Sequence, residues 1–333
     1  MTIPSPRARA REGRARPLAP PLVALLLLAA ACAPTTSREG ATPAPAGADR
    51  PDPELQRQLE AAVQGFHGGV GVYVRHLRTG ATAAIAADDT FPTASMIKVP
   101  IMVGVFDAMT QGRFRFTDTA PEPRARAKYP EDDISAGLSD TARITVSRLL
   151  TLSLTYSDNS ASLWLQQLAG TGTAINAWLA GHGFAVTRVN ARTADREGDY
   201  DRWGWGQTTP REMARLVTLI RQGQVVSPAA SEEMYRTLTR SFWTGEALSQ
   251  LPPTVQAASK QGAVDQSRSE VVLVNAPSGD YVFCVITKNQ QDESQAADNE
   301  GYVVLRRVSA LLWRYFEPHH PWRPAPGAEH FKP

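Results

Sequence analysis

Residues 91–109 read FPTASMIKVPIMVGVFDAM, and the apolar run after the serine predicts a buried helix. Ser95 and Lys98 are three positions apart, so on a helix they lie on one face, a turn apart. A serine hydroxyl attacks well only after a base has taken its proton. A desolvated lysine near another cation can act as that base, whereas an arginine cannot lose its proton. Ser95 and Lys98 are therefore a candidate nucleophile and base. The plainer alternative is a helix cap followed by a surface lysine.

A second polar motif is Ser157-Asp158-Asn159, which precedes a leucine-rich helical pattern. A hydroxyl at Ser157 can pass a proton between a base and a leaving nitrogen. The Asn159 amide can both donate to and accept from a substrate amide. Ser, Asp and Asn are also the preferred N-cap residues, so an ordinary helix start is the alternative interpretation.

A third motif, Lys260-Gln261-Gly262, follows the strand-like residues VQAAS and precedes Ala263. A lysine on an edge strand can hold a carboxylate and shift the pKa of neighbouring groups. A glycine there lets a substrate backbone lie close along the strand. An exposed strand end is the alternative.

The order of secondary-structure patterns predicts an α+β fold. A helical pattern over residues 53–65 is followed by a predicted hairpin, 69–76 and 81–86. Helical patterns then dominate from about 95 to 240. Strand-like runs return at 255–259, 270–274 and 281–287, before a final helix over about 297–316. We therefore expect an antiparallel sheet built from both chain ends with flanking helices, and an inserted all-helical subdomain.

The two ends of the chain differ from this block. Residues 1–32 combine arginines, a ten-residue apolar run and small residues before Cys32, which predicts a signal peptide of the lipoprotein type. Lipidation of Cys32 would be the only membrane attachment; cleavage nearby without lipid is the alternative. Either outcome places the protein outside the cytoplasm, in the periplasm or cell envelope. Residues 33–52, rich in Pro, Ala and Thr, resemble a tether, and 317–333 an irregular tail.

Charge and composition exclude some functions. The small net charge of +2 comes from the arginines of the leader, so the remaining chain is slightly acidic and nucleic-acid binding is not expected. Only five lysines occur, against 30 arginines, and two of them lie in the motifs above. Cys284, in the apolar run 281–286, is predicted to be a core residue. No motif for a metal or an organic cofactor is present, and we expect a monomer.

Taken together, the three motifs resemble those of the serine β-lactamases and penicillin-binding proteins, in the same order. The resemblance covers about 53–316 and is greatest to class A β-lactamases and related serine hydrolases. Thr208-Thr209-Pro210, before an amphipathic helical pattern, is similar to that group as well. The resemblance implies a small-molecule substrate, either a β-lactam or a peptidoglycan-like peptide.

The same resemblance implies a role for each motif residue. Ser95 would be acylated, Lys98 would take its proton, and Ser157 would relay a proton to the leaving nitrogen. Asn159 would bind the substrate amide, and the N–H groups of Ser95 and Ala263 would form the oxyanion hole. The substrate carboxylate would be held at the third motif. The residues assigned to this carboxylate site are Lys260, Gln261, Gly262 and Arg268.

Two departures from the family pattern concern carboxylate recognition and deacylation. Gln261 stands where Thr or Ser is usual. The segment 187–210 lacks the Glu-x-x-Leu-Asn pattern whose glutamate activates the deacylating water, and Thr193 falls at that glutamate's position when counted back from Pro210. Asp195 and Glu197 are the nearby acids that we consider for the role.

The alternatives to a β-lactamase-type hydrolase are a D-Ala-D-Ala-type peptidase, amidase or esterase, a penicillin-binding or sensor module that does not turn over, and a structural lipoprotein with inert motifs.

Overall fold

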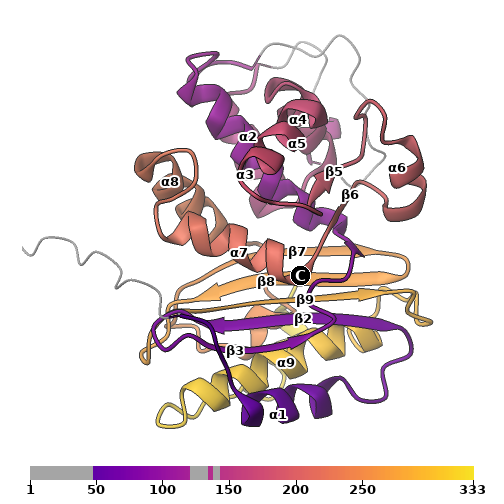
Figure 1. Cartoon of the computed structure of the whole chain (residues 1–333), viewed down its shortest axis with the longest axis vertical. Coiled ribbons are helices and arrows are strands. Elements are labelled where there is room, and N and C mark those ends of the chain that lie inside the picture. Colours follow the sequence, from indigo (N-terminus) through magenta and orange to yellow (C-terminus); the bar gives the residue numbers. More distant parts are fainter. Residues whose placement is uncertain (1–47, 121–133, 138–142) are drawn as a thin grey trace, which may run out of the picture. The chain divides into compact units, whose positions relative to one another are not determined.

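The computed structural model describes residues 48–120, 134–137 and 143–333, and within them a six-stranded sheet joins the two ends of the domain (Figure 1). Its order is β1 (Arg50–Pro51), β3 (Ala81–Ile85), β2 (Gly69–His76), β9 (Tyr281–Lys288), β8 (Ser267–Val274) and β7 (Ala257–Val264). Strand β2 pairs with β9 in antiparallel register, Tyr73 opposite Cys284. All neighbours are antiparallel except β1 and β3. The predicted sheet built from both chain ends is confirmed.

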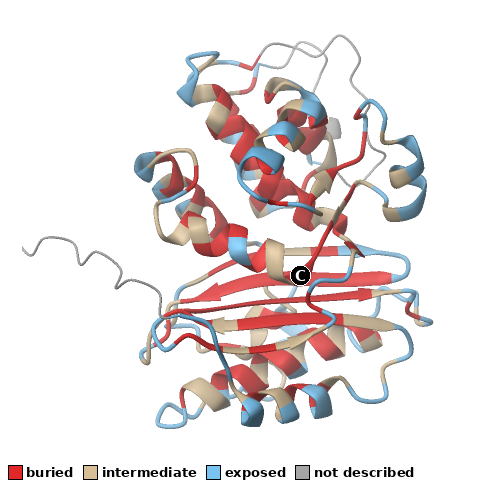
Figure 2. Ribbon diagram, viewed as in Figure 1, coloured by how far each residue is buried: buried red, intermediate tan, exposed pale blue. Residues whose placement is uncertain are grey.

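Helices cover both faces of this sheet and create two hydrophobic cores. Helices α1 (Pro53–Val63) and α9 (Glu300–Phe316) pack on one face with Val72 and Val285. Helices α2 (Lys98–Thr110) and α7 (Pro210–Arg221) belong to the other core with Cys284. Because both faces are covered, β8 and β9 are buried along almost their whole length (Figure 2). Cys284 is fully buried, as expected.

The helical insertion lies between β3 and β7 in the sequence. Besides α2 and α7 it contains α3 (Val146–Thr155), α4 (Asn159–Leu168), α5 (Thr171–Gly181), α6 (Glu197–Trp203) and α8 (Pro228–Leu238). It also contains a small sheet that the sequence did not predict, in the order β4 (Phe91–Pro92), β6 (Gly206–Thr208) and β5 (Arg188–Val189). Strands of two or three residues are too short to show a periodic pattern.

The strand boundaries of the third motif also differ from the expected ones. Strand β7 runs on to Val264 and β8 begins already at Ser267, so the two form a tight hairpin. Because many residues of this hairpin are polar, a hydrophobicity pattern does not predict its full length. They are buried instead: Ser259, Lys260, Arg268 and Glu270 are each at most 2% exposed.

The chain ends are only partly described. The signal segment and Cys32 lie outside the described residues, and so does most of the tether. The last tether residues form β1, and Asp52 caps α1. The tail carries one short 3₁₀ turn, Ala328–Phe331, and is fastened where Trp313 Nε1 donates to the His320 carbonyl. Within the described residues, no helix is long and apolar enough to cross a bilayer.

Candidate active site

Ser95 lies in a 3₁₀ turn, Ala94–Ile97, that leads directly into α2, whose first residue is Lys98. Lys98 is completely buried, and its Nζ donates to Ser95 Oγ at 3.0 Å. The turn begins at Ala94 with φ 44°, in the left-handed region that non-glycine residues rarely adopt. Such strain is concentrated at functional sites, and here it places the serine at the entrance of a buried helix.

The second motif brings a second hydroxyl to the same lysine. Lys98 Nζ also donates to Ser157 Oγ at 3.0 Å, to Asn159 Oδ1 at 2.7 Å and to the Ser157 carbonyl. Ser157 has φ 64°, again in the left-handed region. Asp158 caps α4 by accepting from Ala161 N at 2.7 Å. Asp158 therefore meets the N-cap interpretation, while Ser157 and Asn159 contact the lysine of the first motif.

The third motif, on the edge strand β7, adds a second lysine to the cluster of Ser95, Lys98 and Ser157. Lys260 Nζ donates to Ser157 Oγ at 3.0 Å, so Lys98 and Lys260 approach the same hydroxyl from two sides. Lys260 is 1% exposed, and burial together with the charge of Lys98 lowers its pKa well below the ordinary lysine value. Two like charges that share one hydroxyl in a desolvated site repel each other, which favours one neutral amine.

Gly262 explains how the edge strand reaches the nucleophile. A Cβ on this glycine would lie 2.7 Å from Ser95 N and 2.8 Å from the Thr93 carbonyl oxygen. Real side chains cannot be accommodated at such distances, so only glycine lets β7 lie against the turn that carries Ser95. The partner of the close approach is therefore the protein's own backbone. From the sequence alone, a substrate backbone is the predicted partner.

Gln261 fills the position of the usual hydroxyl residue. Its Oε1 accepts from Lys260 Nζ at 2.5 Å, and its side chain is half-buried. The amide oxygen is thus engaged within the motif, and the remaining donor of the side chain is its NH₂ group.

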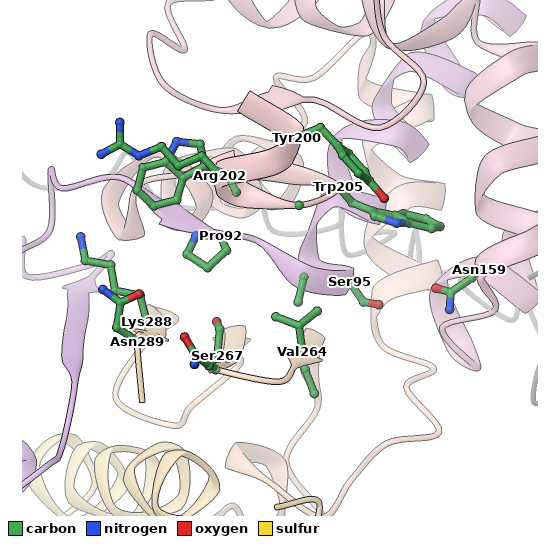
Figure 3. A pocket seen from close by; sticks show the side chains of 15 residues that line it. Pro92, Ser95, Asn159, Tyr200, Arg202, Trp205, Val264, Ser267, Lys288 and Asn289 are labelled. Atoms are coloured by element: carbon green, nitrogen blue, oxygen red, sulfur yellow. The ribbon is translucent and has the colours of Figure 1, made fainter. Parts of the chain in front are cut away.

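Two cavities meet at Ser95. The first, here called the α6 cavity, has a volume of about 400 Å³ and lies under the end of α6 (Figure 3). Its lining includes Ser95, Asn159, Ala263, Tyr200, Arg202, Trp203, Trp205, Val264 and Lys288. The second, the tail-side cavity, has a volume of about 600 Å³. It is lined by Ser95, Ser157, Gln261, Gly262, Tyr156, Trp243, Glu246, Lys332 and Pro333, among others.

Arg268 does not join these residues. Neighbouring residues of a strand point to opposite faces, and Ser269 Oγ faces the site, where it donates to the Thr93 carbonyl at 3.2 Å. Arg268 therefore lies on the other face, 4.8 Å from the Tyr302 ring. Its guanidinium donates to the carbonyls of Ser267, at 3.0 Å, and Ser294, at 2.6 Å. The expected carboxylate contact is replaced by a structural role in the β7–β8 hairpin.

The acids considered for deacylation are not brought to Ser95 either. Asp195 and Glu197 are exposed, and neither belongs to the described lining of the two cavities. Thr193 is buried, and its Oγ1 donates to the Ala191 carbonyl at 3.1 Å. The one acidic side chain within that described lining is Glu246, which pairs with Arg306 at 2.7 Å.

Aromatic residues form walls of the two cavities, and most of them were not among the site residues predicted from the sequence. Trp205 is close to Lys98, whose Nζ lies 5.9 Å from the centroid of its ring. At the rim of the tail-side cavity, Trp243 Nε1 donates to the Tyr156 carbonyl at 2.9 Å. The cluster of tryptophans in RWGWG before the Thr-Thr-Pro element was a visible signal, whereas nothing local marks Trp243 or the tail.

Comparisons with known proteins agree with this architecture. The model of the β-lactamase enzyme family matches residues 54–316. The chain is 29% identical to a β-lactamase of Streptomyces lavendulae and 27% identical to one of Mycobacterium tuberculosis, each over 80% of this chain and 87% of the relative. The solved structure of PBP-A superposes with a TM-score of 0.73 at 25% identity, covering 82% of this chain and 99% of PBP-A. A mutant of PBP-A, solved as its acyl-enzyme complex with penicillin G, has a TM-score of 0.72.

Proposed function

The chain belongs to the β-lactamase enzyme family and is a serine β-lactamase-like hydrolase, and on this basis we propose that it opens the amide of a β-lactam by acylating Ser95. The observation that carries the proposal is the shared hydroxyl. Lys98 contacts both Ser95 and Ser157, and Lys260 contacts Ser157 from the other side. The acyl-enzyme of the similar PBP-A mutant with penicillin G supports the same substrate class.

Acylation follows from these contacts. Neutral Lys98 takes the proton of Ser95 while Ser95 Oγ bonds to the lactam carbonyl carbon. The backbone N–H groups of Ser95 and Ala263 stabilise the oxygen that becomes negative. When the C–N bond breaks, Ser157 gives its proton to the leaving nitrogen and regains one from Lys98. Ser157 Oγ can do this because its two lone pairs accept from the two lysines, which leaves its own proton free to be donated.

In this proposal the two cavities hold different parts of the substrate. Ser157 and Gln261 line only the tail-side cavity of the pair, so the leaving nitrogen and its substituents point there. A carboxylate on that side lies near Lys260, whose charged form it favours, and near the Gln261 amide donor. The other substituent of the carbonyl, the acyl side, extends into the α6 cavity past Asn159.

Deacylation is proposed to be the slow step. Hydrolysis of the ester needs a base that activates water, and Glu246, the one acidic side chain in the described lining, is paired with Arg306. This observation favours a second candidate function, a penicillin-binding protein that acylates and turns over very slowly. A peptidase acting on peptidoglycan-like peptides would use the same acylation groups.

One experiment tests the proposal. The purified protein is mixed with a chromogenic cephalosporin, and colour and intact mass are followed together, with Ser95→Ala as the control. We expect an adduct on Ser95 that decays slowly, with turnover that is measurable but low. A stoichiometric adduct without turnover would favour the penicillin-binding function. No adduct, and the same behaviour in Ser95→Ala, would refute acylation by β-lactams.

We further propose that the protein is exported and lipidated at Cys32, on the evidence of the leader sequence. In cells, the wild type is expected in the membrane fraction and to incorporate a labelled fatty acid. Cys32→Ser should lose the label. Equal labelling of the two proteins would contradict lipidation at this cysteine.

A further inference from the structure

The α6 cavity carries positive charge at one end. Its described lining contains two cations, Arg202 and Lys288, and no carboxylate. Figure 3 shows the charged ends of both side chains on the same side of the cavity, at the end away from Ser95. A group that enters from Ser95 therefore meets the aromatic residues before it meets the two cations.

Lys288 is held in this position by its own contacts. Its Nζ donates to the Thr90 carbonyl at 3.0 Å and lies 4.1 Å from the centroid of the Phe91 ring. Its nearest acid, Asp89, is 3.8 Å away and 61% exposed. A mostly hydrated carboxylate at that distance neutralises the lysine only weakly, and an ammonium group has three donors. Lys288 thus retains charge and a donor for a ligand in the cavity.

Arg202 contributes the second charge from the opposite wall. Its guanidinium lies 4.8 Å from the centroid of the Trp203 ring, which orients the planar group by a cation–π contact. It is the one arginine within α6 and is exposed to solvent. An arginine can bind a carboxylate through two parallel hydrogen bonds, so it suits an anionic group better than a neutral one.

The walls between Ser95 and the cations are aromatic. Tyr200 and Trp205 lie over the cavity on the side of Ser95, as Figure 3 shows. Aromatic rings bind the faces or edges of other rings and of apolar groups. The cavity therefore combines an apolar part near the nucleophile with a positive part farther out.

We propose that the enzyme selects β-lactams whose acyl side group carries a carboxylate, with Lys288 and Arg202 as the specificity-determining residues. This inference rests on the proposed acylation of Ser95, because that reaction directs the acyl side into the α6 cavity. The carboxylate lies beyond the apolar part of the side group and pairs with the two cations.

A matched pair of penicillins tests the proposal. Benzylpenicillin and its derivative with a carboxylate at the para position of the phenyl ring differ only by that carboxylate, which lies beyond the ring, so the ratio of their second-order acylation rates reports that carboxylate alone. We expect the para-carboxylate derivative to acylate Ser95 about fivefold faster than benzylpenicillin, since an exposed ion pair contributes about 1 kcal/mol. Added salt should reduce the ratio, because it screens exposed charges.

Two variants and one control locate the effect. Arg202→Gln removes an exposed charge without risk to the core, and Lys288→Met keeps an unbranched side chain against Phe91. Each should bring the ratio down toward one. Arg236→Gln, an exposed arginine that pairs with Glu232 on α8, should leave the ratio and both rates unchanged.

The outcomes separate this inference from the proposed function. A wild-type ratio at or below one, or a ratio that neither variant changes, overturns the selection of anionic side groups while acylation of Ser95 stands. Failure of both penicillins to acylate Ser95 overturns the proposed function and this inference with it.

Discussion

At the scale of single residues, the site depends on two residues that a chemically similar amino acid cannot replace. In the proposed mechanism Lys98 must be able to lose a proton, and in the structure Gly262 must have no side chain. Both requirements were visible as residue types in the sequence. The physical reason for the residue type could be inferred from the sequence only for Lys98, because the neighbours of Gly262 come from a segment far away in the chain.

Replacement of Lys98 by arginine tests the base directly. Lys98→Arg keeps the positive charge but removes the group that can be deprotonated, so acylation of Ser95 should fall by about 100-fold or more. Intact-mass kinetics with benzylpenicillin measures the fall. A melting curve shows whether the variant is folded, and acylation at the wild-type rate by a folded variant would rule out Lys98 as the base.

A methyl group at Gly262 should push β7 away from the nucleophile. The added Cβ meets the Ser95 and Thr93 backbone at 2.7 and 2.8 Å, so Gly262→Ala is expected to slow acylation strongly and to lower the melting temperature. Gly181→Ala in α5 is the matched control, since a Cβ there has no neighbour within 4 Å. Acylation by Gly262→Ala at the rate of this control would contradict the close-packing explanation.

At the scale of elements, the sheet edge near the site is held together by buried polar groups. Glu270 on β8 accepts from Ser259 Oγ of β7 at 2.6 Å and from the N–H of Ala247 at 2.8 Å. Hydrophobic periodicity predicted the middle of each strand but not the hairpin between them, because those polar residues resemble a loop in the sequence. Their burial is a property of the pairing and of α9 above it.

Glu270 makes the stability of this edge depend on pH. Burial raises its pKa to about 7. Between the ordinary glutamate pKa of 4.5 and about 7, the folded protein holds a proton that the unfolded chain has lost. Stability should therefore fall as the pH rises through this window, by about 3 kcal/mol in all from this group.

Denaturant unfolding from pH 4.5 to 7.5 measures this dependence. In Glu270→Gln the fall due to this group should disappear, whereas Glu232→Gln, at an exposed site, should follow the wild type. If Glu270→Gln and the wild type keep the same pH dependence, the buried carboxyl does not titrate in this range.

At the scale of the whole molecule, distant segments form the walls of the substrate cavities. The tail reaches the site although it lies more than 200 residues after Ser95: Lys332 and Pro333 line the tail-side cavity, and a Cβ at Gly245 would lie 3.4 Å from both. Fastening at Trp313 and the packing of Trp322 against the core of α1 and α9 hold this segment.

Removal of residues 328–333 should widen the tail-side cavity. Cephalosporins with a large substituent on the leaving side are then expected to acylate Ser95 severalfold faster, whereas those with a small substituent should change little. His330→Ala, an exposed tail residue outside the described cavity lining, is the control. Equal rates for the truncated and full-length proteins with the large substrate would show that the tail does not limit access.

The sequence by itself determined the parts of this protein that depend on local order. These are the pairing of Ser95 with Lys98 across one helical turn, the helix that starts after Ser157, the hairpin near one end of the domain and the strands near the other. Periodicity and short spacing are sufficient there, because the interacting residues are neighbours in the chain.

Only the tertiary structure decided how those parts meet. It placed Lys260 and Lys98 on the same Ser157 hydroxyl, turned Arg268 to the opposite face of the sheet, and left Asp195 and Glu197 away from Ser95. It also assembled the aromatic and cationic walls of the α6 cavity from α6, the segment after it and the end of β9. Which face a side chain points to, and what lies opposite it, follows from the packing of both cores on one sheet, and this packing has no local signature in the sequence.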